Sequence, residues 1–299
     1  MGHPLQAAPL THAAEPMGHR EPLMSDDTTP EAAAPPPVAG TPHEHPLPYV
    51  FAIGQIRARF RDPGVEKEFA QMVGATDTQG LTTDEVLREV LARPENRYLA
   101  RQMQYVLTIQ GVDTYDVVPH YAEDYTKLIE AVRPAPTPLD LDVVVGVRDP
   151  LGAAGSCGGI ALPVLEFYQA YSFDRPSLYN AIEKPDGMPA ERFRATADEV
   201  LTKILQITEN VGATPEDRAA NFVACRYEAV YLKTFEAFAD DYALTSIKVR
   251  PAAVGGDQGV MNFTVTYTSR TTDLTEKYSV LVSTRYMNPY LLTRLGPSL

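Results

Sequence analysis

Hydrophobic and polar residues alternate in several short stretches of the chain, and this pattern predicts β-strands. Residues 49–60, YVFAIGQIRARF, combine β-branched and aromatic side chains, a composition typical of strands. Residues 104–119 contain two such stretches that meet at Gly111, which predicts a hairpin. An uninterrupted apolar run in residues 139–149 is typical of a strand covered on both faces. Three further strands are predicted at residues 244–252, 259–270 and 275–286.

Other stretches repeat their apolar residues with the period of an α-helix. A short helix is predicted over residues 65–74. Thr82 and Glu85 form a capping box that opens the next helix, and Pro94 ends it. Further helices are predicted over residues 96–103, 121–133 and 189–212. Gly212 is the expected stop of the last one.

The strongest helix signal follows Thr214. Thr214 is a predicted N-cap, Pro215 suits the first helical position, and Asp217 completes a capping box. A broad apolar face then runs from Phe222 to Phe238. This pattern predicts one long amphipathic helix.

The order of these elements indicates the fold class. Strands and helices are mixed without a regular βαβ rhythm, although residues 160–173 fit either a strand or a helix. The sequence therefore predicts an α+β fold, with a mixed, largely antiparallel sheet and several packed helices, rather than a doubly wound sheet.

Residues 1–48 differ in composition from the rest of the chain. They hold 11 of the 26 prolines and five of the six histidines, and they contain no Val, Ile or aromatic residue apart from Val38. Such a segment cannot bury enough apolar surface to offset the entropy of ordering. We predict a disordered tail rich in Pro, Ala and His over residues 1–48, followed by a single domain over residues 49–299.

The composition excludes several classes of protein. The formal net charge of -13 argues against nonspecific nucleic-acid binding, which depends on clustered Lys and Arg. No run of about 18 apolar residues exists, so no membrane span is predicted, and the N-terminus lacks the apolar stretch of a secretory signal. The two cysteines cannot form a disulfide framework, and they fit a reducing, cytoplasmic location.

No strong catalytic motif is present. Cys157 lies in a glycine-rich stretch, residues 151–159, and His120 is the one histidine after residue 48. They form the one nucleophile–base combination available outside the tail; the alternative is a loop thiol and a surface histidine. The stretch departs from the dinucleotide fingerprint, and no C-x-x-C, H-x-x-x-H or H-E-x-x-H motif indicates zinc. We therefore predict no cofactor and no metal.

Three arginines stand out against this acidic background. Arg57, Arg59 and Arg61 occupy alternate positions, and alternate side chains of a strand share a face. Such a row can bind the carboxylates of an acidic partner bidentately. Arginines on a strand edge also prevent neighbouring molecules from pairing with it. The residues alone leave both interpretations open.

Long stretches of the chain resemble one known family. The similar stretches, in order, are residues 49–60, 64–71, 96–115, 132–150, 162–174, 221–239 and 269–283. They resemble the C-terminal domain of unknown function of cyanobactin maturation proteases of the PatA and PatG type, and the similarity runs from about Tyr49 to about Leu295. The family pattern retains Arg59 but lacks Arg57 and Arg61, so the arginine row is partly particular to this chain.

This resemblance implies a role in making ribosomally synthesised, post-translationally modified peptides. It does not imply proteolysis, because the subtilisin-like domain that carries the Ser-His-Asp triad in the family is replaced here by the tail. A free-standing copy resembles accessory proteins of related pathways, such as crocagin biosynthesis. The family domain has no established reaction, so the resemblance transfers no catalytic residue.

In this context we expect a noncatalytic protein that binds the leader of a precursor peptide or serves as a scaffold. Strand-rich segments can accept an added peptide strand, and tyrosines offer flat contact surfaces. The predicted peptide-binding residues are Arg57, Arg59, Arg61, Tyr98, Arg101, Tyr105, Tyr168 and Tyr171. The alternatives are an enzyme of uncharacterised type that uses Cys157, His120 or a carboxylate, and a dimeric assembly domain. The expected partners are the precursor peptide, other enzymes of the pathway and a second copy of the chain in a homodimer.

Overall fold

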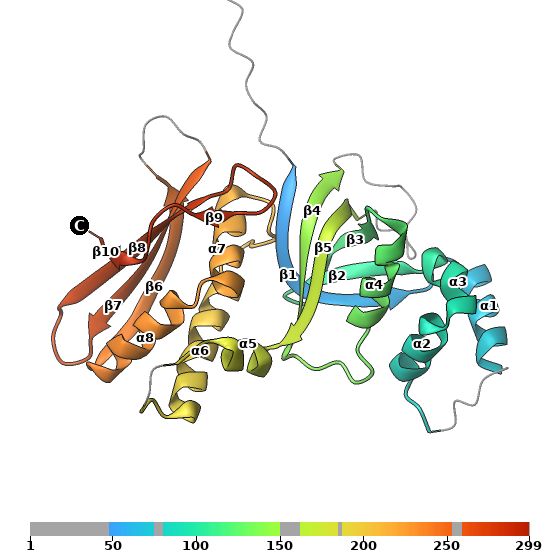
Figure 1. Ribbon diagram of the computed structural model, residues 1–299, viewed down its shortest axis with the longest axis horizontal. Helices are drawn as coiled ribbons and strands as arrows, with labels where there is room; N and C mark the ends of the chain where they lie inside the picture. Colours follow the sequence, from blue (N-terminus) through green and yellow to red (C-terminus); the bar gives the residue numbers. More distant parts are fainter. Residues whose placement is uncertain (1–47, 75–79, 150–161, 185–186, 253–258, 299) are drawn as a thin grey trace, which may run out of the picture. The chain divides into compact units, whose positions relative to one another are not determined.

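Five strands in the first part of the chain close into a barrel. The computed structural model describes residues 48–74, 80–149, 162–184, 187–252 and 259–298 (Figure 1). The barrel strands are β1 (Tyr49–Arg59), β2 (Gln104–Ile109), β3 (Val112–Pro119), β4 (Asp140–Asp149) and β5 (Val164–Asp174), in the order β1-β2-β3-β5-β4. Neighbours are antiparallel except β3 and β5, which run parallel. The ambiguous stretch 160–173 thus contains a strand, and the tail predicted over residues 1–48 lies, except for its last residue, outside the described residues.

Alternation along β1 separates two hydrophobic cores. Val50, Ala52 and Ile56 belong to the core inside the barrel, which the helices between β1 and β4 help to close. Phe51 and Ile53 point to the opposite face, because successive side chains of a strand alternate. They join a second core with helices that follow β5 in the chain. One strand therefore anchors both cores.

The described helices lie in segments that the sequence predicts to be helical, apart from the helix directly after β5, which was not predicted. They are α1 (Pro63–Gly74), α2 (Thr83–Ala92), α3 (Arg97–Gln102), α4 (Tyr125–Ala131), α5 (Arg175–Ala181), α6 (Ala190–Leu205), α7 (Pro215–Arg226) and α8 (Ala229–Ala239), with 3-10 turns at Pro94–Asn96 and Ala122–Asp124. Both predicted capping boxes are confirmed, since the hydroxyls of Thr82 and Thr214 accept hydrogen bonds from the N–H groups of Glu85 and Asp217. None of the described helices combines the length and the hydrophobicity needed to cross a bilayer.

A second sheet completes the fold. Its strands are β6 (Tyr242–Pro251), β7 (Val260–Ser269), β8 (Thr275–Ser283) and β10 (Gly296–Pro297), with β9 (Tyr290–Leu291) paired to β8. Helix α7 contacts β1 as well as β6 and β7, so the second core continues from the barrel into this sheet. The predicted α+β class is confirmed, and the strands are divided between two sheets. Residues Pro46–Leu299 form one compact unit.

Two helix predictions are wrong in their extent. Helix α6 ends at Leu205 and not at Gly212. Gly212 has a φ of 77°, and a Cβ on it would lie 2.4 Å from the carbonyl O of Phe51, so this glycine permits a close backbone approach. The single helix expected after Thr214 is broken between α7 and α8, because the backbone at Tyr227 is extended (φ -128°, ψ 90°).

Candidate functional site

A cleft of about 810 Å³ opens on the outer face of the barrel beside the second half of β1. Gln55, Arg57 and Arg59 line it. They continue the face of Phe51 and Ile53, because all of these residues occupy odd positions of the strand. The opposite walls come from the β2–β3 hairpin, the segment before β4 and the C-terminal end of α6. We call this hollow the cleft.

A second hollow of about 300 Å³ lies along the backbone edge of the same part of β1. Ile56 and Ala58 line one side of it, and Val132, Arg133 and Asp140 line the other. The β1 arginines of the cleft line this hollow too. The second half of β1 therefore borders open space both on its outer face and at one edge. We call this second hollow the edge groove.

The strand register explains why this edge is open. Strand β4 pairs with β1 only from Tyr49 to Gly54. Strand β2 pairs with Gln55–Arg59 on the other side. Among the described residues, no strand pairs with Gln55–Arg59 on the side away from β2. Unpaired backbone at a strand edge is a template for a further strand.

The first half of β1, by contrast, has partners on both sides. Past the end of β2, the N–H of Phe51 donates to the carbonyl O of Gly212 at 2.9 Å. Asn221 Nδ2 donates to the carbonyl O of Phe51 at 2.8 Å, and Asn210 Nδ2 donates to Asn221 Oδ1 at 2.7 Å. At Phe51 these contacts act in place of the missing strand and satisfy both backbone groups.

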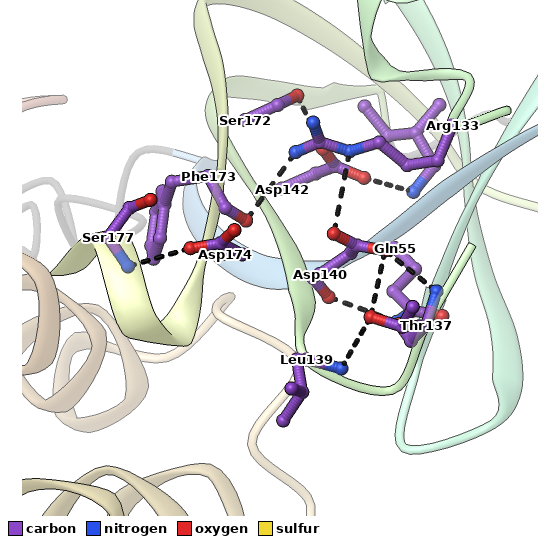
Figure 2. Close-up of polar contacts among 11 residues, drawn as sticks. Gln55, Arg133, Thr137, Leu139, Asp140, Asp142, Ser172, Phe173, Asp174 and Ser177 are labelled. Carbon is purple, nitrogen blue, oxygen red and sulfur yellow. Dashed lines mark hydrogen bonds and ion pairs between the residues drawn. The ribbon is translucent and has the colours of Figure 1, made fainter. Parts of the chain in front are cut away.

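A buried carboxylate closes the corner where β4 begins. Asp142 is 2% exposed. Its two oxygens accept hydrogen bonds from the N–H of Ile56 at 2.6 Å and from Ser172 Oγ at 2.5 Å, and Figure 2 shows this carboxylate within its polar network. Burial raises the pKa of Asp142 to about 6, although both hydrogen bonds act to lower it. Asp142 thus caps the first free N–H of the open edge.

Gln55 fixes the segment that forms the far wall of the edge groove (Figure 2). Its Nε2 donates to the carbonyl oxygens of Thr137 at 2.7 Å and of Asp140 at 3.0 Å. The Asp140 carboxylate accepts from the N–H of Thr137 at 2.7 Å and lies 4.0 Å from Arg133 Nε. Arg133 Nη2 also donates to the carbonyl O of Phe173 at 3.5 Å. The charged groups of this wall are therefore engaged with each other or with backbone.

The arginines of the cleft differ in their partners. Arg59 binds Asp113 bidentately, with N–O distances of 2.6 and 2.8 Å, and this hydrogen bonding lowers the pKa of Asp113. Arg175 pairs with Asp198 at 3.0 Å. Arg57 has no carboxylate within ion-pair distance among the residues that the structure describes. Its positive charge also helps to lower the pKa of Asp113, but it forms no ion pair of its own within the described part of the chain.

The row of three arginines is divided by the end of the strand. Arg61 lies beyond β1 and lines neither hollow. Burial raises the pKa of Tyr125, and the positive charges of Arg61 and Arg101 offset part of that rise, which places both arginines near Tyr125. Tyr105 is 1% exposed in the barrel core, and its hydroxyl donates to the carbonyl O of Ala100. These predicted binding residues therefore lie away from the cleft.

Two of the predicted tyrosines also lie elsewhere. Tyr98 is exposed on α3, and its hydrogen bond with Glu68 raises the pKa of the phenol. Tyr171 lies on β5 with the guanidinium of Arg226 4.8 Å from its ring centroid. Neither tyrosine lines the cleft or the edge groove.

His120, the predicted base, and Tyr168, the fourth predicted tyrosine, form a separate cluster. His120 Nδ1 lies 3.0 Å from Glu166 Oε1, and its ring stacks on Tyr168 with centroids 4.1 Å apart. Cys157, the nucleophile paired with His120 in the sequence-based alternative, lies outside the described residues. Within the described part of the chain, no group of three or more His, Cys, Asp or Glu residues is placed to hold a metal.

The sequence reasoning missed three residues that shape the site. Asp142 and Gln55 form hydrogen bonds at the open edge, and Asp113 forms an ion pair with Arg59. An acid directly before the apolar run of β4 was a usable signal for Asp142, because an acid in a buried strand needs a local partner. Gln55 and Asp113 gave no comparable signal, since their partners are distant in sequence.

The fold and the site define a class: an α+β domain with a closed five-stranded barrel, a second antiparallel sheet, and a cleft that carries free and paired arginines. The PatG Domain family model matches residues 49–250, and the chain belongs to this family. A solved structure described as "PatG Domain of Unknown Function" has the same fold, with a TM-score of 0.67 and 18% identity over 84% of this chain and 98% of that chain. None of the curated proteins matches the chain. The family resemblance expected from the sequence is confirmed.

Proposed function

We propose that this domain binds the leader of a precursor peptide, without catalysing a reaction, in the biosynthesis of a ribosomally synthesised, post-translationally modified peptide. Membership of the PatG Domain family supports the biosynthetic context. The observation that carries the proposal is the cleft beside β1, where Arg57 is open to an anion next to an unpaired strand edge.

The charges of the cleft favour an acidic ligand. Arg57, Arg59 and Arg175 line it, with Asp113 as the one carboxylate among its lining residues. The chain as a whole has a net charge of -13, so this surface is a local exception. Such a positive cleft attracts anionic partners and speeds their encounter. The bidentate pair of Arg59 and Asp113 is a template for the way a peptide carboxylate would bind Arg57.

The dimensions of the cleft also suit a short peptide segment. A volume of about 810 Å³ falls within the roughly 300–1,000 Å³ that is usual for small-ligand sites. Its lining combines apolar groups such as Ile53 and Leu205 with a few polar ones. That combination is typical of sites that bind through shape and a small number of oriented contacts.

The test is a calorimetric titration of the pathway's precursor peptide, full length and leader alone. We expect micromolar binding by the wild type, weakened about 10-fold by Arg57→Ala through loss of one bidentate charged contact and weakened further at high salt. Arg61→Ala is the matched control, because Arg61 is the same residue type and lies outside both hollows. The control should bind like the wild type.

Two outcomes would contradict the proposal. Absence of leader binding by the wild type would remove the recruitment role. A change in the mass of the peptide after incubation with the protein alone, seen by mass spectrometry, would show an enzyme instead. The homodimer expected from the sequence stays a prediction, and light scattering is its direct measurement.

A further inference from the structure

We infer that the peptide binds as an added β-strand on the open edge of β1, with acidic side chains at alternate positions facing Arg57 and Arg59. The inference rests on the proposed function and specifies its recognition chemistry. It commits to an extended segment with the pattern acid, small apolar, acid.

The backbone groups that face the edge groove follow from strand alternation. In an antiparallel pair, successive residues direct their N–H and C=O groups to opposite sides. The N–H of Ile56 points away from β2, because it donates to Asp142. Phe51, at an odd position, points the other way, to Gly212 and Asn221. The N–H and C=O of Ala58 therefore point to the open edge, beyond the carboxylate of Asp142.

The edge groove provides the space for an added strand. It runs between Ala58 on one side and Val132 and Arg133 on the other, which leaves the backbone of β1 accessible from the side. An added strand would hydrogen-bond to Ala58 and to the carbonyl O of Ile56, as peptides do when they extend a sheet. It would lie on the same side of β1 as β4, next to the residues that follow the last β1–β4 pair, Gly54 with Asp142.

Side chains of the added strand would alternate between two environments. Those on the outer face would lie beside Arg57 and Arg59, which line both hollows. Those on the inner face would meet Ala58 and Val132, so small apolar residues fit there. The resulting recognition pattern is an acid at every second position. A peptide with consecutive acids would place half of them against apolar groups.

The carboxylates that line the edge groove are Asp84, Asp140 and Asp142. Asp142 accepts two hydrogen bonds, and Asp140 accepts from Thr137 and lies beside Arg133. Asp84 is in the first turn of α2, where the helix dipole favours a negative charge. Arg57 has no carboxylate within ion-pair distance among the described residues. It therefore offers a positive charge at the open edge that no described carboxylate pairs.

The first test uses a synthetic probe and the unaltered full-length protein. The probe is a short acetylated and amidated peptide in which Glu and Val alternate, compared with a peptide of the same composition in which the Glu residues are consecutive. Single N-methyl groups are then placed on each amide of the alternating peptide. We expect methylation at every second amide to weaken binding by about 5-fold or more, because each lost N–H removes one main-chain hydrogen bond. Methylation of the amides between them should change binding less than about 2-fold.

The outcomes separate this inference from the proposed function. If the leader binds and the alternating peptide does not, or if N-methylation shows no alternation, strand addition is wrong while peptide binding stands. If the leader does not bind either, the proposed function is wrong as well. Preference for the alternating peptide together with an alternating methylation profile supports strand addition.

A second measurement reports on the protein side. On peptide binding, the amide of Ala58 should gain protection from hydrogen exchange, and the amide of Phe51, already bonded to Gly212, should not change. Ala58→Pro removes the same donor without removing a bond to β2, and proline is tolerated at strand edges. We expect this variant to bind about 5-fold or more weakly. Equal protection of both amides, or unchanged binding by a folded Ala58→Pro variant, would overturn the inference.

Discussion

The two halves of β1 belong to one continuous strand and have opposite surroundings. From Tyr49 to Gly54, strand β4 covers one edge, and Gly212 with Asn221 covers the other. From Gln55 to Arg59, strand β2 covers one edge, and beyond Asp142 the other edge borders a groove. The strand is continuous, so the rigid half fixes the position of the accessible half.

A binding surface can arise in a closed barrel where neighbouring strands differ in length. A barrel abolishes free edges only where every strand extends as far as its neighbours. Here β1 runs past the start of β4, and the mismatch leaves an edge that no described strand covers. Polar side chains that sit on a rigid strand are held more precisely than side chains on loops. A surface for recognition therefore follows from unequal strand lengths and requires no separate loop.

The largest expected effect comes from breaking the covered half. Gly212→Ala would place a Cβ 2.4 Å from the carbonyl O of Phe51 and 2.7 Å from Cα of Ala52, at a φ of 77°. We expect a loss of roughly 4 kcal/mol or more in the free energy of unfolding, measured by urea denaturation. Gly111→Ala is the control, because Gly111 has a φ of 81° and no atom within 4 Å of a Cβ. It should cost only about 1 kcal/mol. Equal losses of unfolding free energy would show that the close approach of Gly212 to Phe51 adds no cost to the substitution.

The second effect concerns the carboxylate that separates the two halves. The folded state holds the Asp142 proton more tightly than the unfolded chain does, because burial raises the pKa from 3.8 to about 6. The contribution of this group to stability is therefore greatest below pH 4 and is lost as pH rises towards about 6. A shift of this size corresponds to roughly 3 kcal/mol.

Asp142→Asn isolates that contribution. The amide keeps an acceptor for the N–H of Ile56 and a donor for Ser172, and it does not titrate. The difference in unfolding free energy between variant and wild type should move in favour of the variant by roughly 3 kcal/mol between pH 4 and pH 7. Urea denaturation of both proteins across this range measures it. A difference that stays constant with pH would show that Asp142 titrates alike in the folded and unfolded states.

Local signals in the sequence predicted most of the elements. The capping boxes at Thr82 and Thr214 depend on residues three positions apart, and both formed as predicted. The hairpin at Gly111 was predicted from its turn, and the structure has positive φ at both turn residues. Gly212 misled the prediction, because its conformation suits a helix end as well as the contact with Phe51 that the structure contains.

The candidate site was only partly predictable, because it depends on register. The alternation of Arg57 and Arg59 gave their common face correctly. The strand ends at Arg59, so Arg61 does not share that face. The alternation of residues does not indicate where the strand ends. The pairing of Arg59 with Asp113 requires the alignment of three strands. The open edge likewise arises because β4 pairs with only part of β1. The sequence of either strand alone does not show where this pairing stops.

A smaller effect is expected from a change beside the open half of β1, at the ion pair of Arg59 and Asp113. Asp113→Asn would leave Arg59 without its carboxylate partner and make both β1 arginines of the cleft available to a ligand. We expect the leader to bind about 3-fold more tightly, with a loss of no more than about 1 kcal/mol in unfolding free energy, because the pair is largely exposed. Calorimetry and urea denaturation measure the two quantities.

Asp124→Asn is the control for this change, since it removes an ion pair with Lys127 that lies outside both hollows. It should leave leader binding unchanged. Tighter binding by Asp113→Asn alone would mean that Asp113 competes with the peptide for Arg59, so that the domain regulates its own affinity through an internal carboxylate. Weaker binding would mean the opposite: Asp113 would position the Arg59 guanidinium for the ligand, and the paired arginine rather than the free one would direct recognition.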